Sequence, residues 1–168
     1  MLSGAVLVVG QRADITVQDR VLYRPESVEK EVSALQGRLH AACGVDYFAI
    51  ARNLYPWKLV PDLVIGRPEY DNFLVRLAST HKVSVVDATQ TLTALHQTDK
   101  DGLGAGHRRN DSEHNRKTLS RFQSLRGCGE TSCTGYKTRW QTETVLMSRL
   151  VVKQKRRRVV VERRKIKK

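Results

Sequence analysis

Residues 47–96 read YFAIARNLYPWKLVPDLVIGRPEYDNFLVRLASTHKVSVVDATQTLTALH, and the order of patterns in this stretch decides the fold class. The apolar segments Tyr47–Ala51 and Val83–Val86 are typical of buried strands, and Leu63–Ile65 is a shorter run of the same kind. Between Leu63–Ile65 and Val83–Val86, apolar residues recur at helical spacing over residues 68–82. Strands and a helix therefore alternate, as in a layered α/β sheet.

The flanking segments extend this pattern. Ala5–Val9 is a continuous apolar run that predicts a buried strand, and a helix is predicted from Pro25 to Leu39. Thr89–Leu95 carries three alternating threonines and favours extended structure. Residues 97–115 form a long polar loop, and near its end Ser112 is expected to cap a short helix that runs through Leu119. The fold class is thus predicted to be α/β, a mixed sheet with flanking helices.

Positive charge is concentrated at the C-terminal end of the chain. The 168 residues carry a formal net charge of +13, and residues 153–168 hold ten Lys or Arg and one Glu. We therefore expect an α/β domain over residues 1–125, a Cys- and Gly-containing loop with a terminal element over 126–152, and a disordered basic tail over 153–168. No run of 18 apolar residues is present, which predicts no transmembrane helix.

The chain contains the three cysteines Cys43, Cys128 and Cys133 and no secretory signal pattern. Cysteines in such a sequence are expected to be reduced, in the cytoplasm or the nucleus, because a disulfide needs an oxidising compartment. Cys128 and Cys133 have the spacing C-x4-C without a second pair, which argues against a four-ligand zinc site.

Five short motifs follow one another along the chain. They are Pro61-Asp62, Ile65-Gly66-Arg67, Tyr70-Asp71-Asn72-Phe73, Val86-Asp87-Ala88-Thr89 and His96-Gln97. Together with the opening LVVGQRADI, their order resembles a group of bacterial and invertebrate glycosyltransferase-like proteins, which look like family-2 glycosyltransferases of the GT-A fold. The resemblance covers roughly residues 5–120.

This resemblance implies a partial GT-A-like domain that transfers a sugar from a nucleotide-sugar to an acceptor. In such enzymes an N-terminal half binds the nucleotide-sugar with a divalent ion, Mn²⁺ or Mg²⁺. The chain resembles the acceptor half alone. We therefore expect it to be a truncated domain that needs the nucleotide-binding half for activity.

The resemblance makes Asp71 the leading candidate for the catalytic base, with Glu69 beside it. A carboxylate is needed to take a proton from the acceptor hydroxyl, and a helix N-terminus favours its ionised form. The alternative is that one of the two residues only caps the helix. The residues expected to bind the substrate are Gly66, Arg67, Tyr70, Asn72 and Trp57.

Three other features have two interpretations each. His96 follows an apolar run and is the candidate metal ligand or phosphate contact, or else a histidine satisfied within the fold. Asp99-Lys100-Asp101 has the Asp-x-Asp pattern of a metal site, but its glycine-rich surroundings favour a solvated turn. Trp57 is either a platform for sugar stacking or, as is commoner, an anchor of its loop.

The tail suggests a second class of function. Clustered Lys and Arg attract phosphate groups, so nucleic-acid binding or nuclear import is the alternative, beside a solvated extension without a partner. Aromatic residues do not interleave with the charges in this segment, which argues against base stacking. The residues assigned to nucleic-acid contact are Arg156, Arg157, Arg158, Arg163, Arg164 and Lys165.

Overall fold

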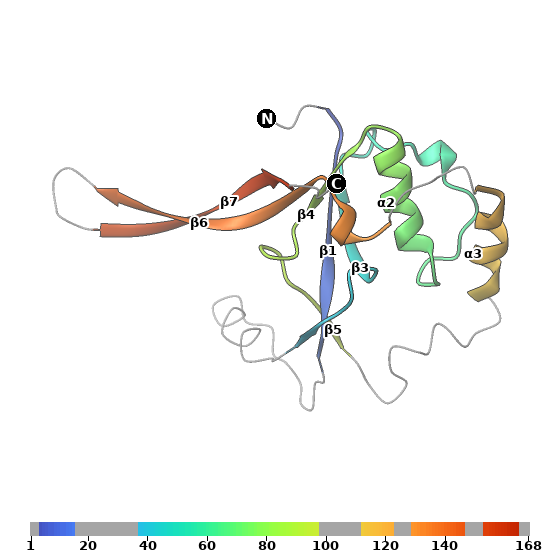
Figure 1. The fold of residues 1–168 in the computed structure, drawn as a ribbon, viewed down its shortest axis with the longest axis horizontal. Helices are drawn as coiled ribbons and strands as arrows, with labels where there is room; N and C mark the ends of the chain where they lie inside the picture. The colour runs from blue at the N-terminus through green and yellow to red at the C-terminus, as the bar shows by residue number, and fades with distance from the viewer. Residues whose placement is uncertain (1–3, 16–36, 98–111, 123–128, 147–152, 165–168) are drawn as a thin grey trace.

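The structure is a computed structural model in which seven strands form a mixed sheet. It describes residues 4–15, 37–97, 112–122, 129–146 and 153–164. The strands are β1 (Val6–Ile15), β2 (Arg38–Leu39), β3 (Val45–Ile50), β4 (Ser84–Asp87), β5 (Ala94–Gln97), β6 (Tyr136–Leu146) and β7 (Lys153–Arg163). The helices are η1 (Trp57–Leu59), α2 (Tyr70–Thr80), α3 (Ser112–Leu119), η2 (Ser120–Phe122) and η3 (Thr131–Cys133). The predicted α/β class with a mixed sheet is confirmed (Figure 1).

Strand β1 is paired along both edges. Its first half pairs with β3 in antiparallel and with β4 in parallel orientation. Its second half pairs with β2 in antiparallel and with β5 in parallel orientation, so that Asp14 lies between Arg38 and His96 in the register. The strand predicted at Ala5–Val9 is confirmed as the first half of β1, which continues to Ile15.

Helix α2 supplies much of the hydrophobic core. The helix predicted over residues 68–82 is confirmed over Tyr70–Thr80. Its buried side chains pack with Leu7 and Val9 of β1, and each large apolar side chain that is fully buried contributes roughly 1.5–3 kcal/mol. The buried residues of α2 are Phe73, Leu74, Val75, Leu77 and Ala78.

The apolar run Leu63–Ile65 is not a strand, which makes that prediction wrong. Asn115 of α3 is fully buried, and its Oδ1 accepts a hydrogen bond from the Val64 amide at 2.8 Å. Its Nδ2 donates to the carbonyl oxygens of Val64 at 3.0 Å and Pro68 at 3.1 Å. Because one side chain satisfies both backbone groups of Val64, this segment needs no neighbouring strand.

Two other predictions need correction in part. The helix predicted to end at Leu39 falls mostly on residues 16–36, which lie outside the described residues, but Arg38–Leu39 form β2 because they pair with β1. Of the extended segment predicted at Thr89–Leu95, only the part from Ala94 onward is a strand, where β5 pairs with β1. The short helix Ser112–Leu119 is confirmed as α3.

The prediction of a disordered tail is wrong for residues 153–163. They form β7, which pairs antiparallel with β6 from Tyr136↔Arg163 at one end to Leu146↔Lys153 at the other. Both strands contain β-branched residues, which favour a paired strand even though β7 is strongly basic. We call β6 and β7 together the basic arm, and Figure 1 shows it extending away from α2 and α3.

Asp87, which is only 7% exposed, joins the basic arm to the rest of the sheet. Its carboxylate accepts a hydrogen bond from the Thr89 amide at 2.9 Å and pairs with the guanidinium of Arg164. Arg164 also donates to the Ser132 carbonyl oxygen at 2.7 Å, and the Thr138 hydroxyl donates to the Asp87 carbonyl oxygen at 3.4 Å. The base of the arm is therefore held by side chains as well as by the β4–β6 pairing.

We predict that Asn115→Ala lowers the free energy of unfolding by roughly 3 kcal/mol, because it leaves part-buried backbone groups of Val64 and Pro68 without this partner. Urea unfolding followed by circular dichroism measures this. Glu113→Gln is the control, since it changes an exposed side chain of the same helix. A loss for Asn115→Ala as small as that of the control would contradict the role assigned to Asn115.

Candidate functional site

Five charged or titratable side chains form a continuous network beside the second half of β1. Arg12 and Asp14 lie on β1, Asp46 on β3 and His96 on β5, while His40 follows β2. Strand pairing explains why they meet, since β2, β3 and β5 all pair with β1. We call this set the histidine–carboxylate network.

Every member of the network is joined to the next by a hydrogen bond. Arg12 donates from Nε to Oδ1 of Asp14 at 2.9 Å and from Nη1 to Oδ1 of Asp46 at 3.0 Å. The second carboxylate oxygens bind imidazoles: Nδ1 of His40 lies 2.8 Å from Asp14 Oδ2, and Nδ1 of His96 lies 3.2 Å from Asp46 Oδ2. The order is thus histidine, carboxylate, arginine, carboxylate, histidine.

The network is most accessible at its two histidines. The side chains of Arg12 and Asp14 are 16% and 15% exposed, whereas those of His40 and His96 are 26% and 41% exposed. An ionised carboxylate only accepts hydrogen bonds, so Nδ1 of each imidazole is the donor in its contact with the aspartate.

Electrostatics keep the Asp14 end of the network ionised. Burial alone raises the pKa of Asp14, but hydrogen bonds from His40 and Arg12, together with the charges of both, outweigh burial and lower that pKa below its usual value. The carboxylate therefore remains charged in moderately acidic solution and continues to orient His40.

Asp71 lies in the first turn of α2, as predicted, and is partly buried. Burial raises its pKa, the hydrogen bond from the Val45 amide at 3.4 Å acts in the opposite direction, and the nearby charge of Asp46 raises the pKa further. Glu69 occupies the N-cap position with a left-handed φ of 73° but makes no capping hydrogen bond. Its carboxylate lies 4.0 Å from Arg76, so it belongs to a surface ion pair.

The residues predicted to bind substrate are not gathered into one pocket. Asn72 is used structurally, since its Nδ2 donates to the carbonyl oxygens of Cys43 at 3.0 Å and Gly129 at 2.9 Å. Trp57 is 46% exposed, and its ring packs against Tyr55 at a centroid distance of 4.4 Å. This contact fits the loop-anchor interpretation of Trp57.

The other three members of that set lie around the start of α2. Gly66 is an exposed turn residue with φ of 71°, and Arg67 donates a hydrogen bond to its carbonyl oxygen at 3.0 Å. Tyr70 is partly buried and packs against the hydrophobic core. These positions form the entry to the helix that carries Asp71 rather than a cavity.

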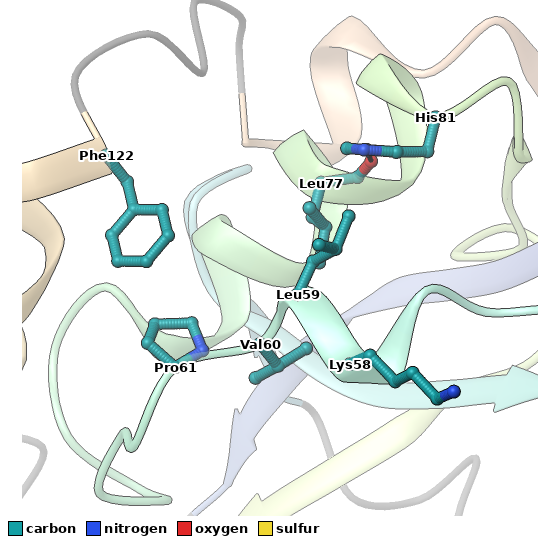
Figure 2. Close-up of a pocket in the computed structure, with 7 residues that line it drawn as sticks. All are labelled: Lys58, Leu59, Val60, Pro61, Leu77, His81 and Phe122. Atoms are coloured by element: carbon teal, nitrogen blue, oxygen red, sulfur yellow. Dashed lines mark hydrogen bonds between the residues drawn. The ribbon is translucent and has the colours of Figure 1, made fainter.

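A separate pocket of about 320 Å³ opens near the other end of α2 (Figure 2). Its walls are mostly apolar, and it contains none of the predicted catalytic or substrate-binding residues. The lining residues are Lys58, Leu59, Val60, Pro61, Leu77, His81 and Phe122. Figure 2 shows Phe122 and Pro61 on one side and Leu77 and His81 on the other.

The predicted metal site has no matching set of ligands. Nδ1 of His96 is bonded to Asp46, and no three His, Cys, Asp or Glu side chains converge within the described ranges. The Asp-x-Asp sequence at residues 99–101 lies outside the described residues.

The basic tail residues differ in what they are able to contact. Arg164 pairs with Asp87 and donates to the Ser132 carbonyl oxygen, which gives it an anchoring role at the base of the arm. Arg163 is exposed. In the register of the arm, residues 156–158 lie opposite residues 141–143, whereas Lys165 lies outside the described residues.

The cysteines are not all in the reduced state that the sequence led us to expect. Cys133 is disulfide-bonded, while Cys43 is free and exposed. Cys128 lies outside the described residues.

Sequence reasoning identified His96 but missed Arg12, Asp14, His40 and Asp46. None of these four belongs to the five short motifs, although Arg12 and Asp14 lie in the opening run LVVGQRADI, and they are brought together by strand pairing rather than by sequence spacing. The one available signal was the alternation of charged residues at positions 12 and 14, next to a strongly apolar run.

Comparison of the chain with protein-family models, with curated proteins and with solved structures finds no match. In the part of the chain that the structure describes, no helix is both long enough and apolar enough to span a membrane.

We predict that Asp14→Asn destabilises the fold at neutral pH by roughly 1–2 kcal/mol, because it removes the charge that binds Arg12 and His40. The pKa of Asp14 is lower in the folded chain than its ordinary value. The ionised carboxylate therefore stabilises the fold fully at pH values above the ordinary pKa of an aspartate. The contribution disappears as pH falls through the lowered folded pKa. Unfolding midpoints of the variant and the parent should therefore differ at pH 7 and converge in acid; a difference that persists in strong acid would contradict this assignment.

Proposed function

We propose that the chain provides the acceptor side of a sugar transfer from a nucleotide-sugar, with Asp71 as the base that takes the proton from the acceptor hydroxyl. The observation that carries the proposal is the place of Asp71 in the first turn of α2, where its partly buried carboxylate accepts a hydrogen bond from the Val45 amide at 3.4 Å. Burial raises the pKa of this carboxylate, and the charge of Asp46, whose own carboxylate binds the imidazole of His96, raises it further.

Removing the proton from the acceptor hydroxyl needs a carboxylate that binds a proton more tightly than an ordinary aspartate does. Burial and the charge of Asp46 both raise the pKa of Asp71, which makes it a stronger base than an exposed aspartate. In the proposed step, Asp71 takes the hydroxyl proton while the acceptor oxygen forms the new bond to the sugar. The bond between the sugar and the nucleoside diphosphate breaks, and the diphosphate leaves with its electron pair.

The histidine–carboxylate network supports this step through its arrangement of charge. Arg12 neutralises part of the negative charge of Asp14 and Asp46, which limits repulsion against an incoming phosphate group. His40 and His96 offer polar ring nitrogens to sugar hydroxyls. Glu69 is left out of the mechanism because it belongs to a surface ion pair with Arg76.

The basic arm favours a second candidate function, the binding of nucleic acid. Clustered Lys and Arg attract the phosphates of any nucleic acid and release counterions on binding. The two strands of the arm hold eight lysines or arginines and two glutamates, counted over residues 136–146 and 153–163. The arm also extends away from the helices, which leaves room for a long partner (Figure 1).

For sugar transfer, we predict that Asp71→Asn, in this chain supplied with the nucleotide-binding half, lowers the transfer rate at least about 100-fold, because the amide accepts the Val45 hydrogen bond but does not take up the proton. Release of nucleoside diphosphate from a panel of nucleotide-sugars, with simple glycosides as acceptors and Mn²⁺ present, measures this. In the parent chain the rate should fall as pH drops through the raised pKa of Asp71.

Asp62→Asn is the matched control, since Asp62 is exposed and lies in the same run of motifs. Unfolding curves establish that both variants fold. Transfer that survives in Asp71→Asn would remove Asp71 from the mechanism, and absence of transfer with every donor would contradict the proposal for this chain.

For nucleic-acid binding, we predict that replacing Arg156, Arg157 and Arg158 together with alanine weakens binding and reduces the slope of log affinity against log salt by about 2–3. Fluorescence anisotropy of a labelled oligonucleotide at several salt concentrations measures the slope. The matched control removes three exposed charges from the body of the protein, at Arg52, Lys58 and Arg121. Equal effects of the two triple variants would show that the arm has no special part in binding.

A further inference from the structure

Trp140 is half exposed on the basic arm and lies beside two exposed valines. The indole side chain is 49% exposed, and those of Val159 and Val161 are 47% and 43% exposed. Trp140 is paired in the register with Val159, and Thr138 is paired with Val161. Because directly opposed residues and every second residue of a strand share one face, Trp140, Val159 and Val161 lie on the same face of the arm.

The pairing of β6 with β7 also places Trp140 in register with the residue that follows a strongly basic stretch of sequence. Along β7, residues 153–158 hold five Lys or Arg and end immediately before Val159, and Arg163 follows two residues after Val161. An aromatic residue therefore does stand among the charges, which corrects the expectation drawn from the tail sequence alone. That expectation failed because Trp140 is contributed by the neighbouring strand.

We propose that the Trp140 face of the arm binds unpaired nucleotides of single-stranded RNA or DNA. The indole stacks on a base, and the flanking lysines and arginines contact the phosphates. This inference rests on the second candidate function and adds to it the class of nucleic acid. A flat, exposed aromatic ring gains little from phosphate alone, whereas an unpaired base presents a free face for stacking.

The charge of the arm argues against a second copy of the chain as the occupant of this face. With eight basic and two acidic residues in its two strands, the arm repels another arm and attracts a polyanion. The ion pair between Arg139 and Glu162 is internal to the arm and leaves the excess of positive charge in place.

The base of the arm is fixed by strand pairing, a hydroxyl contact and an ion pair, so the arm is ordered before a partner binds. The antiparallel register is continuous along the two 11-residue strands, and the hydroxyl groups of Thr138 and Thr91 lie 2.5 Å apart. Arg164 adds its ion pair with Asp87. Trp140 stands two residues from Thr138, so stacking orders little additional backbone and loses little entropy.

The test compares Trp140→Ala with Trp57→Ala, which removes the other, equally exposed tryptophan. Three labelled probes are titrated by anisotropy: a thymidine oligomer of about 20 nucleotides, a duplex of the same length and heparin, which has charge but no bases. We expect Trp140→Ala to weaken binding of the oligomer about 5- to 100-fold and to leave heparin binding unchanged. Trp140→Phe should retain most of the affinity, and Trp57→Ala should change none of the three.

Each other outcome overturns the inference in a recognisable way. If Trp140→Ala changes nothing while the triple arginine variant weakens all three probes, the arm binds by charge alone and only the stacking is refuted. Equal losses for the oligomer and heparin would point to damage to the arm, and a preference for the duplex would exclude unpaired bases. Failure of the parent to bind any probe at low salt would refute both this inference and the second candidate function.

A second copy of the chain is tested separately by light scattering across a range of concentrations. Dimerisation that Trp140→Ala abolishes would mean that the Trp140 face pairs with another arm. That result would overturn the assignment of this face to single-stranded nucleic acid.

Discussion

The rest of the structure depends on the requirement that β1 satisfy its backbone on both edges. Its first half is bounded by β3 and β4, and its second half by β2 and β5. Leu7 and Val9 hold the first half in the core, beneath α2. Segments from widely separated parts of the chain therefore converge on one strand, and the polar residues at or next to the paired positions come into contact. The histidine–carboxylate network is the direct consequence.

Several polar residues that belong to the sequence motifs stabilise the fold through hydrogen bonds and ion pairs. Asp87 belongs to one of the motifs of the glycosyltransferase resemblance, yet its carboxylate binds Thr89 and Arg164 and so fixes the base of the arm. Asn72 belongs to another and ties Cys43 to Gly129. Such residues are needed for folding whatever the reaction, and this is why the proposal for sugar transfer is built on Asp71.

The two candidate functions use separate parts of the molecule. The histidine–carboxylate network lies beside the second half of β1, whereas the arm leaves the sheet through the pairing of β4 with β6. The network is nearly balanced in charge, with one arginine between two aspartates, and the arm is strongly positive. The network therefore suits a substrate that is held by hydrogen bonds, and the arm suits a polyanion that is held by charge.

The sequence by itself determined the features that depend on neighbouring residues: the first half of β1, the helices α2 and α3, the strand β4 and the concentration of charge near the C-terminus. Only the tertiary structure decided the features that depend on distant partners. Asn115 takes the place of a strand beside Val64, and Trp140 joins the charges of β7. Apolar periodicity is read within a few residues, but a hydrogen bond or a strand register joins positions whose separation along the chain no local pattern records.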